Sequence, residues 1–423
     1  MFMIDKQFIA CGDMAISENI LMRERVYLSL VSFFAPISSV VFLSSLQGTT
    51  PANLMLLLAL FPFVSLIIFE KKRMFSVLSV FIRLVCIYFL VTVPPALYSG
   101  FVYLPDTSYF PRASNFPQPL AYILQSSYIV SGFLIYSIMR VYGRHISTSK
   151  LCYGAVFVCV FGLYEFLFFL IFKKNGDFLS NRVFSLGLAS GSWFQTINIA
   201  GTTLMRVKSL TGEPSMLALT ILPFFAYAYI SGKRMMSSLF GITLVLSFST
   251  SAYLGLLFVA LSDAWIRKNY VVVNAVFVAM AVAIAGYMLV PSVNIFFESV
   301  VMSKFNNTSH SGSVRFEYFT NGIRFWISSP SFVKVFGVGF GTIRTTDLLT
   351  TLLINTGLVG VFLTLILFFR PLFYVNKNRL ASALVCGVFV CLIVMLFSVP
   401  EYAYLTTWMF LGLLYSSCNG KVK

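Results

Sequence analysis

The sequence predicts an all-α, polytopic integral membrane protein, and three observations support that fold class. Of the 423 residues, 58% are hydrophobic and only 10% are charged, with a mean hydropathy of +0.88. A soluble domain has about a quarter of its residues charged, so this chain has too few charges to cover a water-facing surface. Its apolar residues gather in runs of the ~20 residues that a helix needs to cross a bilayer. Lys and Arg lie mostly between these runs, as topology signals do. This composition excludes a soluble enzyme, a disordered protein and a nucleic-acid-binding module.

The apolar runs predict about 12 membrane-spanning helices within a single polytopic membrane domain, residues 1–423. One stretch, 237–266, counts as a pair of helices. The other expected spans are 26–46, 52–69, 74–98, 120–140, 151–172, 214–230, 270–290, 347–369, 379–398 and 402–418.

The positions of the basic residues orient these helices. If the N-terminus is cytoplasmic, 18 of the 30 Lys and Arg residues fall in cytoplasmic segments, as the positive-inside rule requires. Both termini then lie in the cytoplasm. Because both flanks of 237–266 are basic and therefore cytoplasmic, this stretch must enter the membrane and return. Its Ser/Thr-rich centre, 247–251, predicts a turn inside the membrane, which is tolerated only where protein or a wet cavity surrounds it.

Three segments assigned to the outside are too long to be simple turns: 99–119, 173–213 and 291–346. The last two are the expected long periplasmic loops. The outside segments together hold 11 basic and seven acidic residues. Export disfavours positive charge, so this excess indicates an anionic ligand, for which a lipid phosphate or pyrophosphate is the obvious candidate at a membrane. The alternative is that long cationic side chains reach lipid headgroups, which we favour for Lys173 and Lys174.

The first of two local patterns runs from Arg206 through Lys208 to Glu213 and directly into an apolar span. Pro214 suits the first turn of a helix, which places Glu213 at the N-terminus, where the helix dipole favours a carboxylate. Glu213 is therefore either a helix cap or a carboxylate at the mouth of a site.

The second pattern lies in 311–326, where apolar residues recur at helical spacing and predict a helix on the outer membrane surface, starting near Ser313 and ended by Pro330. Arg315 and Arg324 are nine positions apart, about 180° round a helix, so they cannot both bind one ligand, and we favour Arg315. The glycines of 337–341 are interpreted as a loop, with a phosphate-binding turn as the alternative. Asp347, which begins the next span, is either a cap or a site carboxylate.

These segments resemble the superfamily of O-antigen polymerases (Wzy) and O-antigen ligases. The resemblance rests on the Arg206–Ser215 segment, the Ser/Thr turn at 247–251, the Ser-Gly-Ser-Val-Arg and Gly-Val-Gly-Phe-Gly motifs at 311–315 and 337–341, and the segment 346–360. It implies a GT-C-like glycosyltransferase of the bacterial inner membrane that uses undecaprenyl-pyrophosphate-linked glycans on the periplasmic side. Ligases of this superfamily have a His where this chain has Thr346, and a small-residue-Arg pair where it has Ser251-Ala252. These departures favour the polymerase.

The resemblance implies the roles of the candidate residues. Arg206 and Arg315 are expected to clamp the pyrophosphate of the lipid-linked donor, with Lys208, Arg344 and Arg324 as further cations. A carboxylate is expected to orient or deprotonate the hydroxyl of the lipid-linked acceptor, and the candidates are Asp347, Glu213 and Glu401. No metal or other cofactor is expected, since the sequence has no His/Cys/Asp cluster. Expected partners are the donor and acceptor glycans and membrane lipid, with a chain-length regulator protein as a further candidate and no nucleic acid.

Two alternatives remain open at this point. One is an O-antigen ligase that transfers the glycan to lipid A core. The other belongs to a different class, a flippase for the lipid-linked oligosaccharide, which would share the number of spans but would not need two long outside loops. A flippase should also show weak internal repeats, and none is apparent in the sequence.

Overall fold

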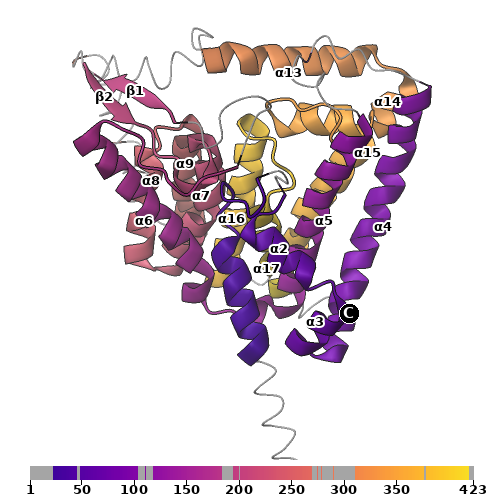
Figure 1. Ribbon diagram of the computed structural model, residues 1–423, viewed down its shortest axis with the longest axis horizontal. Coiled ribbons are helices and arrows are strands. Elements are labelled where there is room, and N and C mark those ends of the chain that lie inside the picture. Colours follow the sequence, from indigo (N-terminus) through magenta and orange to yellow (C-terminus); the bar gives the residue numbers. More distant parts are fainter. Residues whose placement is uncertain are drawn as a thin grey trace, which may run out of the picture.

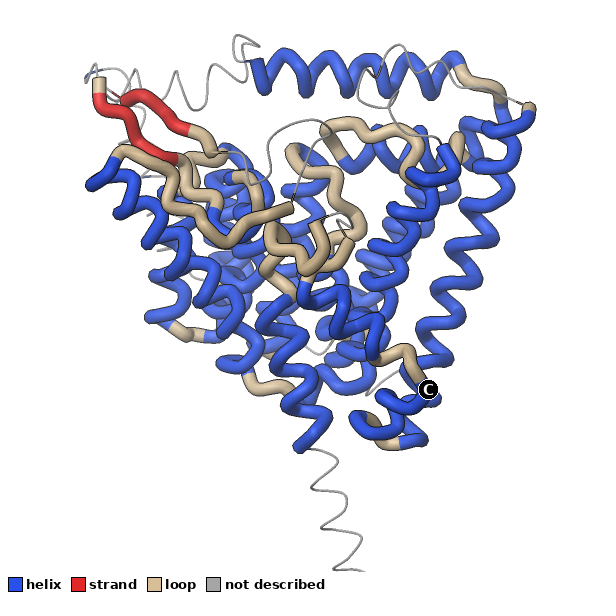
Figure 2. The backbone as a smooth tube through the Cα atoms, in the orientation of Figure 1, coloured by secondary structure: helices blue, strands red, loops and turns tan. Residues whose placement is uncertain are grey.

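The computed structural model describes residues 22–44, 48–102, 110, 118–182, 194–199, 201–268, 274, 278, 289, 310–375 and 378–418. Helices dominate these residues, and one two-stranded antiparallel sheet accompanies them (Figure 1, Figure 2). The predicted class, a mostly helical membrane protein, is confirmed at this coarse level.

Five helices in the described residues are long and apolar enough to cross a membrane, and each lies on a predicted span. They are α4 (Lys71–Phe101), α6 (Thr148–Phe172), α7 (Pro214–Ser231), α15 (Leu348–Phe369) and α16 (Arg379–Phe397). Two further predicted spans form the helices α5 (Gln118–Tyr142) and α17 (Leu405–Cys418). The predicted span 270–290 lies outside the described residues except for 274, 278 and 289.

The first two predicted spans do not form the continuous helices expected of them, because proline interrupts each one. The first helix covers 22–34 and not 26–46. Pro36 ends it, since proline has no N–H to donate and disfavours helical backbone at the residue before it. The predicted span 52–69 is divided into α2 (Pro51–Leu58) and α3 (Pro62–Ile68). Pro62 separates the two helices for the same reason.

The stretch 237–266 forms the predicted pair of short helices. α8 (Arg234–Leu246) and α9 (Thr250–Arg267) are joined by the turn 247–249, where Phe248 adopts a left-handed backbone with φ of 46°. Ser247, Ser249 and Ser251 are all buried. The polar turn is therefore enclosed by protein, as a non-helical segment within a membrane must be.

Helix α15 is interrupted near its middle, at Gly357, whose φ is 61°. The glycine-rich segment that follows α14 (Ser331–Phe336) packs against this interruption, with Val338 N and Gly339 N donating to the carbonyls of Ile354 and Asn355. A Cβ on Gly337 would lie 2.3 Å from the Asn355 carbonyl carbon, so only glycine permits this approach. The backbone of 337–341 thus donates hydrogen bonds to carbonyl groups beside the break in α15. This agrees with the interpretation of the segment as a loop.

Several segments that the sequence assigns to the outside lie together at one end of the helical bundle (Figure 1). They include the hairpin of β1 (Thr196–Ile199) and β2 (Thr202–Met205), the short helix η2 (Ser209–Thr211) and α13 (His310–Ser328). α13 runs across this end (Figure 1), and it stops two residues before Pro330, as predicted, although it starts three residues before Ser313. The short helices η1 (Gly143–His145) and η4 (Arg370–Phe373) follow α5 and α15, respectively, and both contact α17.

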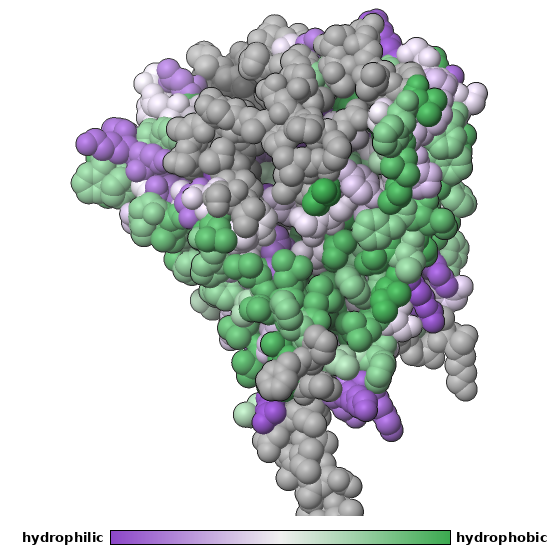
Figure 3. All heavy atoms as spheres, turned by 45° about the vertical axis from the view of Figure 1, so that its right-hand side comes forward, coloured by the Kyte–Doolittle hydropathy of each residue, from purple (hydrophilic) through white to green (hydrophobic). Residues whose placement is uncertain are grey.

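Helix α7 is at the centre of the fold, packing against α8, α9, α16 and α17, and most of its side chains are buried. Apolar side chains also cover much of the outer surface between the two ends of the bundle, as Figure 3 shows on one face. Apolar side chains therefore fill the core and also cover much of the exterior (Figure 3), which is typical of helices that lie within lipid.

Candidate functional site

Arg206 is positioned by the two hairpins that meet at its backbone. The strands β1 and β2 bring Arg206 N within 2.9 Å of the Gln195 carbonyl oxygen, and Val207 N donates to Leu246 O at 3.1 Å. The guanidinium donates from Nη1 to Gln195 Oε1 at 2.5 Å and from Nε to Ser247 O at 3.4 Å. Arg206 therefore lies directly against the tip of the α8–α9 pair.

Lys208, two residues further on, does not join this site. Its Nζ lies 3.2 Å from Glu165 Oε1 and 2.6 Å from Asp177 Oδ2, and all three side chains are almost completely buried. The prediction that Lys208 binds the anionic ligand is therefore replaced by a structural role. Glu165 comes from α6 and also accepts from Ser209 N at 2.9 Å, so this buried ion cluster anchors the loop that carries Arg206.

Glu213 occupies the N-cap position of α7, with extended backbone, but its side chain caps no helix N–H. Ser215 Oγ instead donates to Glu213 Oε1 at 2.6 Å. Among the described residues, nothing donates a hydrogen bond to Oε2. The sequence left two interpretations of Glu213 open, a helix cap and a carboxylate at the mouth of a site. This geometry favours the second.

Three arginines lie close enough to Glu213 for its charge to act on them. Burial lowers the pKa of the Arg206 and Arg315 guanidinium groups, and the negative charge of Glu213 offsets part of that shift in each. Glu213 also raises the pKa of Arg344, although Glu401 is the larger cause. The positive charge of Arg315 further lowers the pKa of Arg206, so these two cations belong to the same end of the site.

Arg315, in the first turns of α13, reaches down to the end of α16. Its Nη1 donates to Ser398 Oγ at 2.9 Å, and Ser251 Oγ donates to the same oxygen at 2.6 Å. Ser251 belongs to α9, so the hydrogen bonds of Ser398 connect α13 to the α8–α9 pair. Arg324, on the same helix, is exposed to solvent. The structure thus separates the two arginines, as their spacing predicts, and leaves Arg324 outside the site.

Arg344 forms an ion pair with Glu401, and Arg344 is the more exposed of the two, with 64% of its side chain accessible against 26%. Glu401 lies in the loop between α16 and α17, three residues after Ser398. The structure therefore brings Arg206, Arg315 and Arg344 together with Glu213 and Glu401 at the end of the bundle that α13 covers.

Asp347 is the N-cap of α15, as one of its two interpretations requires. Its Oδ1 accepts from Thr350 N at 2.8 Å, and its Oδ2 accepts from Thr350 Oγ1. Burial raises the pKa of the Asp347 carboxyl, while the hydrogen bonds from Thr350 act in the opposite direction. With both oxygens engaged, Asp347 is less suited than Glu213 to receive a proton from a substrate.

The sequence did not identify the polar side chains that lie around these charges. Gln195, Ser398 and Tyr402 are examples, and each lies in a loop. Tyr253 was missed as well: it lies near Arg206, and its hydroxyl donates to Val245 O at 3.1 Å. The only sequence signal for Ser398 and Tyr402 was their position on either side of Pro400-Glu401, directly after an apolar span.

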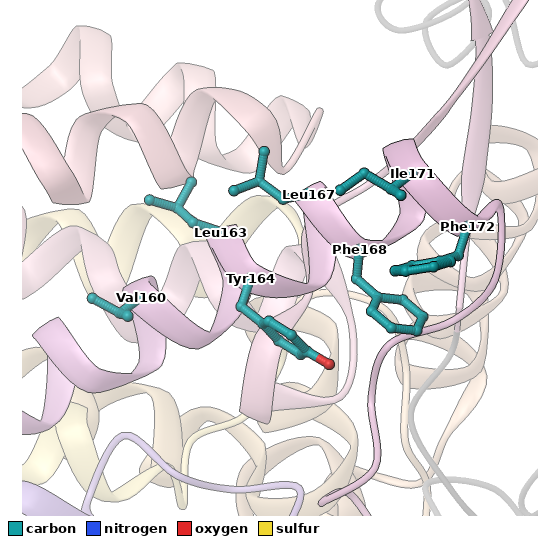
Figure 4. A pocket seen from close by; sticks show the side chains of 7 residues that line it. All are labelled: Val160, Leu163, Tyr164, Leu167, Phe168, Ile171 and Phe172. Atoms are coloured by element: carbon teal, nitrogen blue, oxygen red, sulfur yellow. The ribbon is translucent and has the colours of Figure 1, made fainter.

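An apolar groove on α6 lies apart from these charges. Its lining residues, which Figure 4 shows, all belong to that one helix. Its position on the outer face of a predicted membrane span makes it a surface for lipid, and it adds nothing to the arginine site. Among the described residues, no three His, Cys, Asp or Glu side chains form a group that could hold a metal ion.

The arrangement can bind an anion and, beside it, accept a proton. Two guanidinium groups supply planar, forked donors suited to phosphate, and Glu213, whose charge acts on both, supplies a carboxylate oxygen. In comparisons with models of known protein families and with curated proteins, nothing matches this chain.

Proposed function

We propose that the protein polymerises undecaprenyl-pyrophosphate-linked oligosaccharide repeats, O-antigen or a related surface polysaccharide, on the periplasmic face of the bacterial inner membrane. The proposal includes the GT-C-like architecture with about 12 spans. The observation that carries it is the convergence of Arg206, Arg315 and Arg344 around Glu213, at the tip of the α8–α9 pair. Support also comes from the resemblance to O-antigen polymerases in the segments that contain these residues.

In the proposed reaction, a hydroxyl of one lipid-linked repeat attacks the anomeric carbon of a second lipid-linked chain. The new glycosidic C–O bond forms as the bond to the pyrophosphate oxygen breaks, and undecaprenyl pyrophosphate leaves. Arg206 and Arg315 stabilise the charge that develops on the leaving oxygen, which is the kind of interaction that contributes most to such reactions. Glu213 Oε2 receives the hydroxyl proton. The ion pair with Glu401 holds Arg344 on the side of the site where the acceptor glycan binds in this proposal.

The test is to replace Arg206 and Arg315 singly by Ala and to measure surface polysaccharide on gels together with the amount of protein in the membrane. Each variant should lose polymer about a hundred- to a thousandfold, the usual effect of removing one electrostatic donor from an active site, while the protein accumulates normally. Arg→Lys should restore little, because a point charge replaces a forked donor. Lys173→Ala is the matched control, a cation at a helix end that should have little effect. Normal polymer in both Ala variants would contradict the proposal.

The two alternative functions predict different products when the gene is deleted. Loss of a polymerase leaves a single repeat on the lipid A core, whereas loss of a ligase leaves core without any O-antigen. Loss of a flippase leaves the lipid-linked intermediate on the cytoplasmic side. Only the first outcome agrees with the proposal.

A further inference from the structure

The loop that joins α16 to α17, residues 398–404, contacts two of the three arginines of the site, Arg315 and Arg344. Ser398 binds Arg315 and Ser251, and Glu401 pairs with Arg344. The buried Tyr404 hydroxyl is hydrogen-bonded to Thr220 at 2.5 Å and to Ser38 at 3.2 Å. Each of these residues therefore has a partner that explains its place in the loop.

Tyr402 differs from these residues, because its side chain makes apolar contacts and no hydrogen bond or ion pair in the part of the chain that the structure describes. Its ring rests on Phe340, with centroids 4.7 Å apart and planes at 57°, and its carbonyl accepts from Trp408 Nε1 at 2.7 Å. The contacts with Phe340 and Trp408 hold Tyr402 in position, yet the residue is only partly buried. Within the described residues its hydroxyl has no hydrogen-bond partner.

The charged neighbours of Tyr402 are the ion pair of the site. Glu401 directly precedes Tyr402 in the chain and pairs with Arg344, and both charges act on the Tyr402 hydroxyl, so the carboxylate and the guanidinium lie near the ring. A pyranose ring has a face of C–H groups and an edge of hydroxyls. The negative face of an aromatic ring attracts C–H groups, and a carboxylate and a guanidinium bind hydroxyls by charge-assisted hydrogen bonds. The three groups match a sugar better than they match a phosphate or a lipid tail.

We propose that Tyr402 is a sugar-binding residue, on whose ring a pyranose of the repeat unit stacks while its hydroxyls bind Glu401 and Arg344. The inference rests on the proposed function for the identity of the sugar. It adds a second half to the site: Arg206 and Arg315 bind the phosphate end of a substrate, and Tyr402 binds carbohydrate beyond Ser398. Because Phe340 packs against the ring and Trp408 holds the backbone of the same residue, the ring loses little freedom when a sugar binds.

The experiment measures binding of the repeat-unit oligosaccharide, released from the surface polysaccharide of the host, to the purified full-length protein by saturation-transfer NMR. Tyr402→Leu should weaken binding at least tenfold and remove the transfer to the sugar C–H protons, because Leu is apolar but has no aromatic face. Tyr402→Phe should bind within about twofold of the wild type, which also shows that the position tolerates change. Tyr374→Leu, at a tyrosine 38% exposed beside η4, is the matched control and should bind normally.

Equal binding by wild type and Tyr402→Leu would overturn the inference, as would the absence of any binding to the wild type. Polymer formation in the same cells reports separately on the proposed function. If the wild type makes polymer and Tyr402→Leu makes as much, the arginine site remains and the sugar-binding role of Tyr402 is wrong. If deleting the gene leaves polymer length unchanged while Tyr402 still governs binding, the proposed function is wrong and the sugar site remains.

Discussion

Arg206 and Lys208 are separated by one residue and belong to two charge clusters of opposite character. Lys208 lies between Glu165 and Asp177, and the exposed fractions of the three side chains are 0%, 0% and 2%. Arg206 belongs to a group in which three arginines surround two carboxylates, and several members of that group are partly exposed. The first cluster holds the chain in place, while the second has positive charge left for a ligand.

This contrast shows what separates a structural charge from a functional one in this protein. A buried cation with carboxylates at hydrogen-bonding distance is already satisfied and has no room for a substrate. A partly exposed cation whose partners are neutral, as Gln195 and Ser247 are for Arg206, keeps its charge available. Burial and the charge of the partners therefore decide the role, and residue type does not.

The largest effect that follows from the comparison concerns Lys208. Lys208→Ala should destabilise the protein by about 3–5 kcal/mol, because it leaves buried carboxylates without their cation. The measurement is the amount of folded protein in the membrane and its thermal unfolding in detergent, with Arg206→Ala as the matched control that should remain folded. A Lys208→Ala protein of normal stability that lacks polymer would place Lys208 in the ligand site after all.

The second effect separates the two carboxylates at helix N-termini. Glu213→Gln should reduce the polymerisation rate about a hundred- to ten-thousandfold, as the loss of a general base does. Asp347→Asn should leave polymer nearly normal, because Asn caps a helix as well as Asp. Rates measured with purified protein and lipid-linked repeats decide the matter. The opposite result, an active Glu213→Gln and an inactive Asp347→Asn, would move the base to Asp347.

A smaller effect is the pH dependence of stability at Asp347. Burial raises its pKa in the folded protein above the ordinary value of 3.8, so the folded state binds this proton more tightly than the unfolded state. The wild type should therefore gain stability relative to Asp347→Asn as the pH falls through the raised pKa, with the full gain present below 3.8. Thermal unfolding of both proteins between pH 7 and pH 4 measures the difference, and a difference that grows in the other direction would show that the hydrogen bonds from Thr350 outweigh burial.

The smallest effect is expected at Arg324. This residue is exposed on α13, and surface substitutions usually change stability by less than ~0.5 kcal/mol. Arg324→Ala should therefore keep polymer within about twofold of the wild type, in contrast to Arg315→Ala on the same helix. A strong loss of polymer in Arg324→Ala would extend the ligand site along α13 and weaken the distinction between exposed and site arginines.

The amino-acid sequence by itself determined the helical class, the positions of most helices and the return of 237–266, because apolar runs and flanking charges are local properties. Local chemistry also placed Asp347 and Glu213 at helix N-termini and ended α13 before Pro330. Where a proline interrupted an apolar run, as Pro36 and Pro62 do, counting apolar residues overestimated the helix.

Only the tertiary structure decided which charged residues share a site. Arg206 and Lys208 look alike in the sequence, and the difference between them comes from Glu165 and Asp177, which lie 43 and 31 positions away from Lys208. Arg315 likewise meets Ser398 across 83 positions. Whether a charge is matched depends on partners that packing brings from distant segments, and desolvation then sets its energy. That information is absent from any short stretch of sequence, so the roles of these residues appeared only when the helices were assembled.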